Sequence, residues 1–282
     1  MIIDAHTHVW PRWPYEPPVP DDETRGSYEN LLFQLDAAGV DRAVLVNARI
    51  TRSEDNNDYG ARAVREHPDR FFQIVDLDGR WGPDYHQPGA ADRLRALVDA
   101  YRPAGVSHYL AAKNDGWLRS AEGTAFFEVA AEHSLLVNFA APPVWMADLR
   151  EVARSFPTVP LLVNHLGVVG LHPAGIEEAL ELVLDGGDLP NLLVKVSGYY
   201  YGAERPWDYP YADRMQIVRA FYDSWGPARM IWASDWPSVL PNMSYRQSLE
   251  ILREHAEFLS PADLDLILGN TLADILTARG RM

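Results

Sequence analysis

Short apolar runs alternate with amphipathic segments along the whole chain. An apolar run of roughly four to eight residues is typical of a buried strand, whereas apolar residues three and four apart indicate one face of a helix. The predicted strands cover residues 1–9, 42–48, 71–77, 105–112, 135–141, 160–167, 191–198 and 229–235. The predicted helices between and after them cover residues 28–38, 54–67, 90–101, 122–133, 146–155, 174–185, 211–224 and 245–258.

Eight strands, each followed by a helix, are what a (β/α)8 TIM barrel requires, and the pattern therefore predicts this α/β fold. A further helix is expected over 261–279, with Ser260 as its N-cap and Pro261 at its first position. A doubly wound sheet is the alternative, but it normally has fewer strands, and no glycine-rich phosphate loop follows the first one. Without a linker, a low-complexity segment or an internal repeat, residues 1–282 form a single predicted domain.

The composition narrows the classes of partner. The chain has 282 residues, a net charge of −15 and no basic run, which makes nucleic acid and anionic membrane poor candidates. Cysteine is absent, so a metal site must use histidines and carboxylates. No basic region precedes the first apolar run, and no apolar stretch approaches the ~20 residues that span a bilayer. We expect a cytoplasmic protein with a small-molecule substrate, and a homo-oligomer stays open.

Two histidines stand two residues apart in the first predicted strand, within "DAHTHVW". Side chains at this spacing share a face of a strand, so Asp4, His6 and His8 are expected to point the same way. Neutral imidazole is a good ligand for zinc or iron. The H-x-H pattern by itself is weak, because chance produces it often in a chain of this length.

Further polar residues end two other strands. His165 lies in "NHLG" at the end of the sixth strand, and Asp235 lies in "ASDWP" at the end of the eighth. Each could be an ordinary hydrogen-bonded or turn residue. In a closed barrel, however, strand 8 adjoins strand 1, and the carboxyl ends of the strands carry the active site. The set therefore predicts one shared site that contains His6, His8, His165 and Asp235.

Tryptophans also gather after the strands. Sealing of the barrel mouth is the simple explanation, but the uneven placement favours an aromatic-lined pocket for a ring-like or partly apolar molecule. Trp10 and Trp236, next to the candidate site residues, are the expected substrate contacts. Seven of the nine tryptophans lie at or just past a predicted strand end: Trp10, Trp13, Trp81, Trp117, Trp145, Trp207 and Trp236.

The ordered set "DAHTHVW", "NHLG", "VKVSGYY", "ASDWP" and "ILGNTLADIL" resembles the amidohydrolase superfamily. The likeness is greatest to its amidohydrolase-related branch, which contains sugar-lactone and dicarboxylate-lactone hydrolases, and it runs over nearly the whole chain. The resemblance implies His6 and His8 as metal ligands. It also implies Asp235 as a ligand or general base, and His165 as a polarising or proton-carrying group.

The chain departs from metal-rich relatives at two strands. Strand 5 carries Asn138 where those relatives have a further histidine, and Lys113 ends strand 4, where binuclear relatives keep a carboxylated lysine. We expect one divalent metal, zinc, with metal-independent catalysis as the open alternative. Lys113 is either a substrate-carboxylate contact or an ordinary loop residue. The other loop cations that could bind carboxylates are Arg49, Arg52 and Arg80.

The predicted function is hydrolysis of a small cyclic ester, a sugar or dicarboxylate lactone. Without a metal, an aspartate with an ordinary pKa near 3.9 is a weak base, which suits a reactive ester better than an amide. The alternative is non-oxidative decarboxylation of an unsaturated or aromatic acid. A small-molecule binding protein without activity, and hydrolysis of an amide or phosphoester, stay open because one barrel hosts many chemistries.

Lys195 is one of only two lysines and lies inside the seventh predicted strand. Alternation places it on the inward face with Leu193 and Ser197. An unpaired charge inside a barrel is costly. We therefore expect Lys195 either to pair with Asp4 or another inward carboxylate, or to reach the site. If the alternation slips at a bulge, the lysine points outward instead.

Overall fold

The eight strands form one parallel sheet in sequence order. The structure is a computed structural model that describes residues 1–50 and 52–282. The strands are β1 (Ile3–Thr7), β2 (Arg42–Val46), β3 (Phe71–Asp76), β4 (Gly105–Tyr109), β5 (Leu136–Ala140), β6 (Leu161–Val163), β7 (Leu192–Val196) and β8 (Met230–Trp232). The sheet closes just beyond β8, where Thr7 pairs with Trp236 and the Asp235 amide donates to the His6 carbonyl at 2.9 Å. This confirms the predicted TIM barrel.

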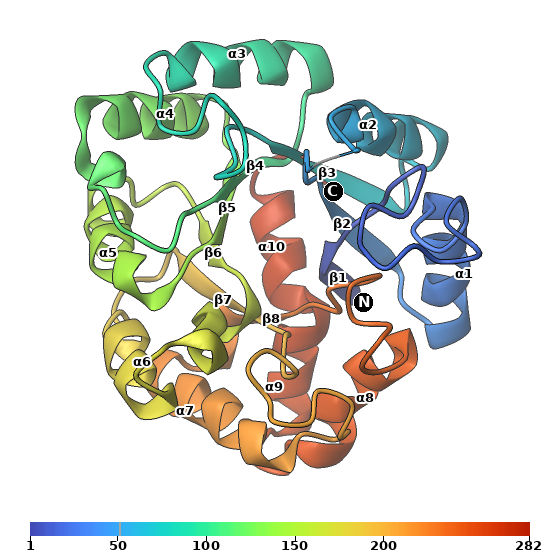
Figure 1. The fold of residues 1–282 in the computed structure, drawn as a ribbon. Helices are drawn as coiled ribbons and strands as arrows, with labels where there is room; N and C mark the ends of the chain where they lie inside the picture. Colours follow the sequence, from blue (N-terminus) through green and yellow to red (C-terminus); the bar gives the residue numbers. More distant parts are fainter. Residues whose placement is uncertain (51) are drawn as a thin grey trace.

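Helices surround the sheet on its outer side (Figure 1). They are α1 (Tyr28–Ala38), α2 (Asn56–Glu66), α3 (Ala90–Tyr101), α4 (Ala121–Glu132), α5 (Met146–Ser155), α6 (Ile176–Leu184), α7 (Met215–Trp225) and α8 (Tyr245–His255). Short 3-10 segments are η1 (Trp117–Arg119), η2 (Pro143–Trp145), η3 (His165–Leu171), η4 (Ala212–Arg214) and η5 (Pro227–Arg229). None of the helices in the described ranges is long and apolar enough to cross a membrane.

The C-terminal segment breaks into three parts: α9 (Pro261–Asp265), the π-helical turn η6 (Leu266–Asn270) and α10 (Thr271–Thr277). Ser260 caps α9 in a capping box and Pro261 takes its first position, as predicted. Leu272 and Leu276 of α10 belong to the apolar cluster that fills the barrel interior. In Figure 1, α10 lies in the middle of the ring of strands. It closes the end of the barrel opposite the carboxyl ends of the strands.

The alternation of side chains slips in β1. The pairing of β1 with β2 shifts register between Asp4 and Thr7. Ala5 belongs to the inner apolar cluster, whereas Asp4 accepts a hydrogen bond from the Tyr245 hydroxyl of α8 at 3.0 Å. The expectation that Asp4 shares the inward face with the two histidines is therefore wrong, because the irregularity turns His6 into the barrel and leaves Asp4 among the helices.

Alternation also fails as a guide at β6. It pairs Val163 with His165 on one face, yet Val163 packs in the outer apolar cluster. His165 lies beyond the strand with φ 53, in the left-handed region that L residues adopt only locally. This backbone turn, rather than strand periodicity, directs its imidazole into the barrel mouth.

Candidate active site

His6 and His8 of β1 form a close imidazole pair. Their Nε2 atoms lie 3.0 Å apart, and both side chains are buried. His8 Nδ1 lies 2.6 Å from the Val46 carbonyl oxygen, which can only accept. That nitrogen therefore carries the hydrogen and leaves the His8 Nε2 lone pair free for a ligand. The Trp10 ring stacks on His8 with 5.1 Å between centroids and fixes the plane of the imidazole.

Asp235 brings a carboxylate to the same point from the segment after β8. Its Oδ1 lies 3.7 Å from His6 Nε2, 3.5 Å from His8 Nε2 and 3.9 Å from His165 Nε2. The backbone of Asp235 has φ 61, so the chain turns sharply here to aim the side chain inward. The structure thus brings together the four residues that the strand-end pattern singled out.

Two tyrosines hold the other oxygen of this carboxylate. Asp235 Oδ2 accepts hydrogen bonds from the hydroxyls of Tyr200 at 2.6 Å and Tyr201 at 3.0 Å. Burial alone raises the pKa of the Asp235 carboxyl group, but the imidazoles of His165 and His8 and the hydroxyl of Tyr200 outweigh it and lower the pKa to about 2. The group is an oriented anion at neutral pH.

The geometry of these donors suits a divalent cation. His6, His8 and Asp235 each offer one ligand atom, and the three atoms lie within 4.8 Å of one another. Ligands ~2.0–2.2 Å from a tetrahedral zinc ion are roughly 3.3–3.6 Å apart. The observed separations of 3.0, 3.5 and 3.7 Å bracket that spacing. Two imidazoles and one carboxylate are a donor set that zinc binds in proteins.

His165 lies beside this cluster and is partly open to the barrel mouth. Its Nδ1 is 2.9 Å from the Ser197 hydroxyl oxygen, which orients the ring. Burial lowers the pKa of His165 to about 4, so the imidazole is neutral at pH 7. Gly198 makes this arrangement feasible, because it has φ 72 and a Cβ there would collide with the His165 Cβ and the Tyr201 ring.

Lys195 points inward from β7, as expected, but it does not pair with Asp4. It is fully buried, and its Nζ lies 3.2 Å from His6 Nδ1. Within the described residues no carboxylate oxygen lies within ion-pair distance of it. Burial lowers the pKa of Lys195 to about 7. The predicted pairing with a carboxylate is wrong, because the slip in β1 turns Asp4 out of the barrel. The other branch of the prediction, that Lys195 reaches the site, is confirmed by its contact with His6.

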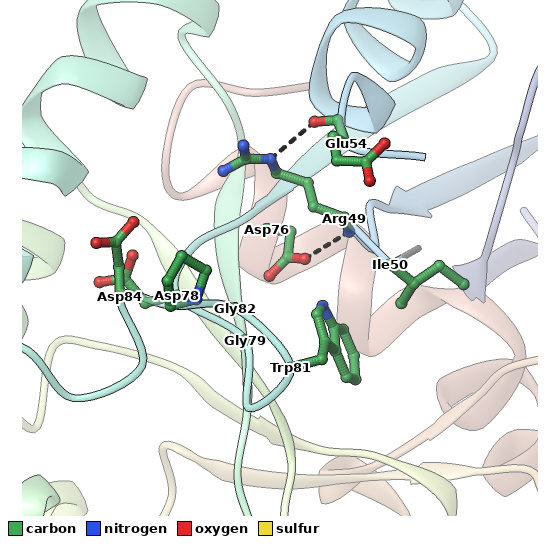
Figure 2. Close-up of a pocket in the computed structure, with 10 residues that line it drawn as sticks. Arg49, Ile50, Glu54, Asp76, Asp78, Gly79, Trp81, Gly82 and Asp84 are labelled. Carbon is green, nitrogen blue, oxygen red and sulfur yellow. Dashed lines mark hydrogen bonds between the residues drawn. The ribbon is translucent and has the colours of Figure 1, made fainter. Parts of the chain in front are cut away.

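Two cavities open near the carboxyl ends of the strands. An apolar cavity of about 530 Å³ lies at the ends of β4 and β5 and against the loop that carries His165; Arg80 and His172 are its polar members. An acidic cavity of about 270 Å³ lies at the ends of β2 and β3 (Figure 2). Tyr109, at the end of β4, lines the first and contacts Trp81 of the second with 4.5 Å between ring centroids.

The predicted cationic contacts lie on the rim. Arg49 is exposed, lines the acidic cavity and donates from Nε to the Glu54 carbonyl at 2.9 Å. Lys113 is exposed and forms no ion pair with any residue that the structure describes. Arg52 pairs with Glu16 at 3.0 Å, so its guanidinium group is engaged at the surface.

The tryptophans are divided between cavity walls and the packed interior: Trp81 lines the acidic cavity and Trp13 lines a further cavity beside Tyr15. Trp10 and Trp236 are fully buried and support the site from behind. Trp117 and Trp145 pack around His86 in the layer of helices, and Trp207 is exposed. Of the seven, Trp81 alone lines either of the two cavities just described. That Trp10 and Trp236 contact the substrate stays a prediction.

Four functional candidates gave little or no signal in the sequence. Tyr200 and Tyr201 follow β7, and their hydroxyls hold Asp235. Ser197 orients His165 from a neighbouring strand. Asp76 ends β3 and is buried in the wall of the acidic cavity. A buried aspartate as the last residue of a strand is the one pattern that could have revealed Asp76.

Comparisons with known proteins agree with this geometry. A family model described as amidohydrolase matches residues 3–276. The chain is 25% identical over 245 residues to L-fucono-1,5-lactonase of Burkholderia ambifaria, a match that covers 83% of this chain and 80% of the lactonase. It is 27% identical over 244 residues to 4-sulfomuconolactone hydrolase of Hydrogenophaga intermedia, covering 83% of this chain and 74% of that enzyme.

A solved structure shares the fold over its full length. It is an amidohydrolase from Burkholderia multivorans crystallised with bound zinc. The TM-score is 0.77 at 20% identity, and the match covers 98% of this chain and 99% of that one. At this identity the likeness shows the fold alone.

Proposed function

We propose, on the premise that the chain belongs to the amidohydrolase family, that it hydrolyses a small cyclic ester, a lactone. The chain is a hydrolase of the amidohydrolase superfamily. The observation that carries the finer proposal is the convergence of His6, His8 and Asp235 at the barrel mouth, with their ligand atoms within 4.8 Å. The two lactone-hydrolysing relatives support the choice of an ester.

We assign one divalent metal, zinc, to His6, His8 and Asp235. When bound, such a metal lowers the pKa of a water molecule toward 7 and polarises an ester carbonyl. Strand 5 adds no imidazole: the buried Asn138 donates to the Ser107 hydroxyl at 2.9 Å. Lys113 is exposed on its loop, so a bridging lysine and a second metal are not part of the proposal. The zinc bound by the Burkholderia multivorans amidohydrolase supports the choice of metal.

The protein side chains divide the proton transfers between them. The two tyrosine hydroxyls hold Asp235 so that Oδ1 faces the imidazoles, where it can accept a proton from the attacking water. His165, neutral and oriented by Ser197, is placed to stabilise the carbonyl oxygen as it gains charge, or to protonate the departing ring oxygen. Water adds to the carbonyl carbon, the ring C–O bond breaks, and a hydroxy acid leaves with release of a proton.

An ester fits this machinery better than an amide. The low pKa of Asp235 makes it a weak base, and an alkoxide departs from a lactone more readily than an amine departs from an amide. The alternative, decarboxylation, needs no added water and leaves no acid.

The test is a panel of five- and six-membered lactones with acid release followed by a pH indicator. The wild type, freed of metal and then supplied with zinc, should open at least one lactone. Asp235→Asn should lower turnover by roughly 10²–10⁴-fold, the usual range for a lost proton acceptor. Asp92→Asn makes the same change on an exposed surface of α3 and should leave turnover unchanged. Release of carbon dioxide without acid, or turnover by Asp235→Asn within a few-fold of wild type, would contradict the proposal.

A further inference from the structure

Asp76, at the end of β3, has an unused carboxylate oxygen inside the protein. The residue is 1% exposed. Its Oδ2 accepts a hydrogen bond from the Arg49 amide at 2.6 Å, whereas its Oδ1 has no partner among the described residues. A buried acceptor without a donor costs stability, and such groups are retained mostly where a ligand satisfies them. The chemistry proposed above does not use this residue.

The acidic cavity that Asp76 lines is poor in cations. Glu54, Asp78 and Asp84 also line it, and Arg49 is its one basic member in the described part of the chain. Figure 2 shows the Arg49 guanidinium group turned away from Asp76 toward Glu54, to whose carbonyl it donates. Asp78 is ion-paired with Arg93 at 2.6 Å, so Glu54 and Asp84 supply the negative charge. The space beside Asp76 therefore offers acceptors and repels an anionic ligand.

An aromatic face completes this wall. Trp81 stands on the loop after β3 and lines the same cavity as Asp76 (Figure 2), and 40% of the residue is exposed. A carboxylate that accepts hydrogen bonds, beside an aromatic ring that packs against C–H groups, suits a neutral molecule with several hydroxyl groups. A dicarboxylate would meet like charge here and would leave the Asp76 oxygen without a donor.

Tyr109 connects this wall to the metal-ligand cluster. Its ring contacts Trp81, and its hydroxyl donates to the Asn47 carbonyl at 3.1 Å. Burial, and after it the charges of Asp76 and Asp235, raise the pKa of Tyr109 well above its ordinary value. The acidic cavity lies at the ends of β2 and β3, and β2 is the neighbour of β1, which carries His6 and His8.

We propose that the acidic cavity is a specificity subsite in which Asp76 accepts hydrogen bonds from the hydroxyl groups of a neutral polyhydroxy lactone. This inference rests on the proposed lactone hydrolysis and names its substrate class. The subsite selects against lactones that carry further carboxylates. Asp76 acts by binding the part of the substrate remote from the ester, so its effect falls mainly on KM.

The experiment compares three lactones of one ring size: a polyhydroxy lactone, its deoxy analogue and a dicarboxylate lactone. The wild type should prefer the polyhydroxy lactone. Burial raises the pKa of Asp76 to about 7, so the comparison is made at about pH 8, where the carboxyl group is mostly ionised. Asp76→Asn should then lower kcat/KM for the polyhydroxy lactone by roughly 10–100-fold, mostly through KM, because a neutral amide replaces the charged acceptor. For the deoxy analogue, the same substitution should change kcat/KM by less than about threefold. Asp92→Asn makes the same change on an exposed surface outside the cavity and should leave kcat/KM within about threefold on all three lactones.

Other outcomes overturn the inference. The inference is overturned if the wild type prefers the dicarboxylate lactone. It is also overturned if Asp76→Asn loses kcat/KM equally on the polyhydroxy and the deoxy lactones. If Asp76→Asn does not fold, Trp81→Ala replaces it, because this exposed ring can be removed with little loss of core, and a KM unchanged for the polyhydroxy lactone contradicts the subsite. If the wild type opens no lactone, the proposed function fails. Calorimetric titration of wild type and variant with the polyhydroxy lactone then decides the subsite alone: binding by the wild type only supports it, and any other result overturns it.

Discussion

Replacing Lys195 with methionine should stabilise the protein and impair its chemistry at the same time. The lysine is fully buried, no carboxylate of the described residues lies within ion-pair distance, and its one close polar neighbour is His6 Nδ1 at 3.2 Å. Breaking a buried ion pair would cost roughly 3–5 kcal/mol. Here there is no such pair to break, and methionine fills similar space without a charge. We therefore expect Lys195→Met to raise the free energy of unfolding rather than to lower it.

The size of the gain follows from the pKa. Burial lowers the pKa of Lys195 from 10.5 to about 7, which at 1.36 kcal/mol per pKa unit corresponds to about 5 kcal/mol of cost for the charged form. Because the pKa is lower in the folded state, the unfolded state binds more protons between pH 7 and 10.5, and wild-type stability rises with pH through that window. Below pH 7 the buried charge of Lys195 destabilises the folded state by this full amount, and above pH 10.5 the destabilisation is absent. The lost contact with His6 offsets about 1 kcal/mol, which leaves a net gain of roughly 3–4 kcal/mol near pH 6.5.

Denaturant unfolding at pH 6.5 and 9.5, with a chelator present, measures this gain. Lys113→Met is the matched control, because Lys113 is the chain's other lysine and is exposed; its stability should change by less than about 0.5 kcal/mol. The gain for Lys195→Met should shrink at pH 9.5. Its kcat/KM should fall roughly 10–100-fold, since His6 loses the partner of its second nitrogen. A variant less stable than wild type at pH 6.5, or a gain that does not depend on pH, would refute the reasoning.

Other expectations follow from the same contacts. Tyr200→Phe removes a hydrogen bond that lowers the pKa of Asp235, so the acid limb of the pH profile of kcat/KM should move to higher pH; an unmoved limb would separate this carboxyl group from the rate. Zinc at about 100 times its Kd should stabilise chelator-treated wild type by about 2.7 kcal/mol in thermal melts, and His8→Asn should abolish the effect; an equal shift in both proteins would place the ion elsewhere. Gly198→Ala should destabilise more than Gly39→Ala, which also has positive φ but has open space around it, as denaturant midpoints would show; equal losses would mean that the collision is relieved.

The strands and helices of the barrel were predictable, because the spacing of apolar residues within each short segment differs between a strand and a helix. The helix at 28–38 and its counterparts at 90–101 and 146–155 match the structure residue for residue. The lengths of the strands were overestimated, since residues such as Ala111 and Ala112 continue the apolar pattern after the strand has ended. Hydrogen bonding to a neighbour decides where a strand ends, and the sequence of one strand does not contain its neighbour.

The residues of the candidate site were predictable from their positions at strand ends, but their orientations were not. The slip in β1 sent Asp4 outward, and a left-handed turn brought His165 inward. Both depend on local irregularities of the backbone, which alternation cannot foresee. The contacts of Tyr200 and Asp76 depend on loops that fold over the barrel mouth, so only the assembled structure reveals them.

The position of α10 makes the order of synthesis matter for folding. Leu272 and Leu276 complete the interior of the barrel, and a Cβ at Gly269 would collide with the carbonyl of Met1, so the last helix docks onto the first residues of the chain. A ribosome adds about 5–20 residues per second, which separates these two segments by tens of seconds at the slower rate. Until α10 has been synthesised, water reaches the barrel interior at the end opposite the carboxyl ends of the strands. The nascent barrel is therefore exposed to aggregation and to chaperones until α10 has been synthesised, and its core becomes complete only then.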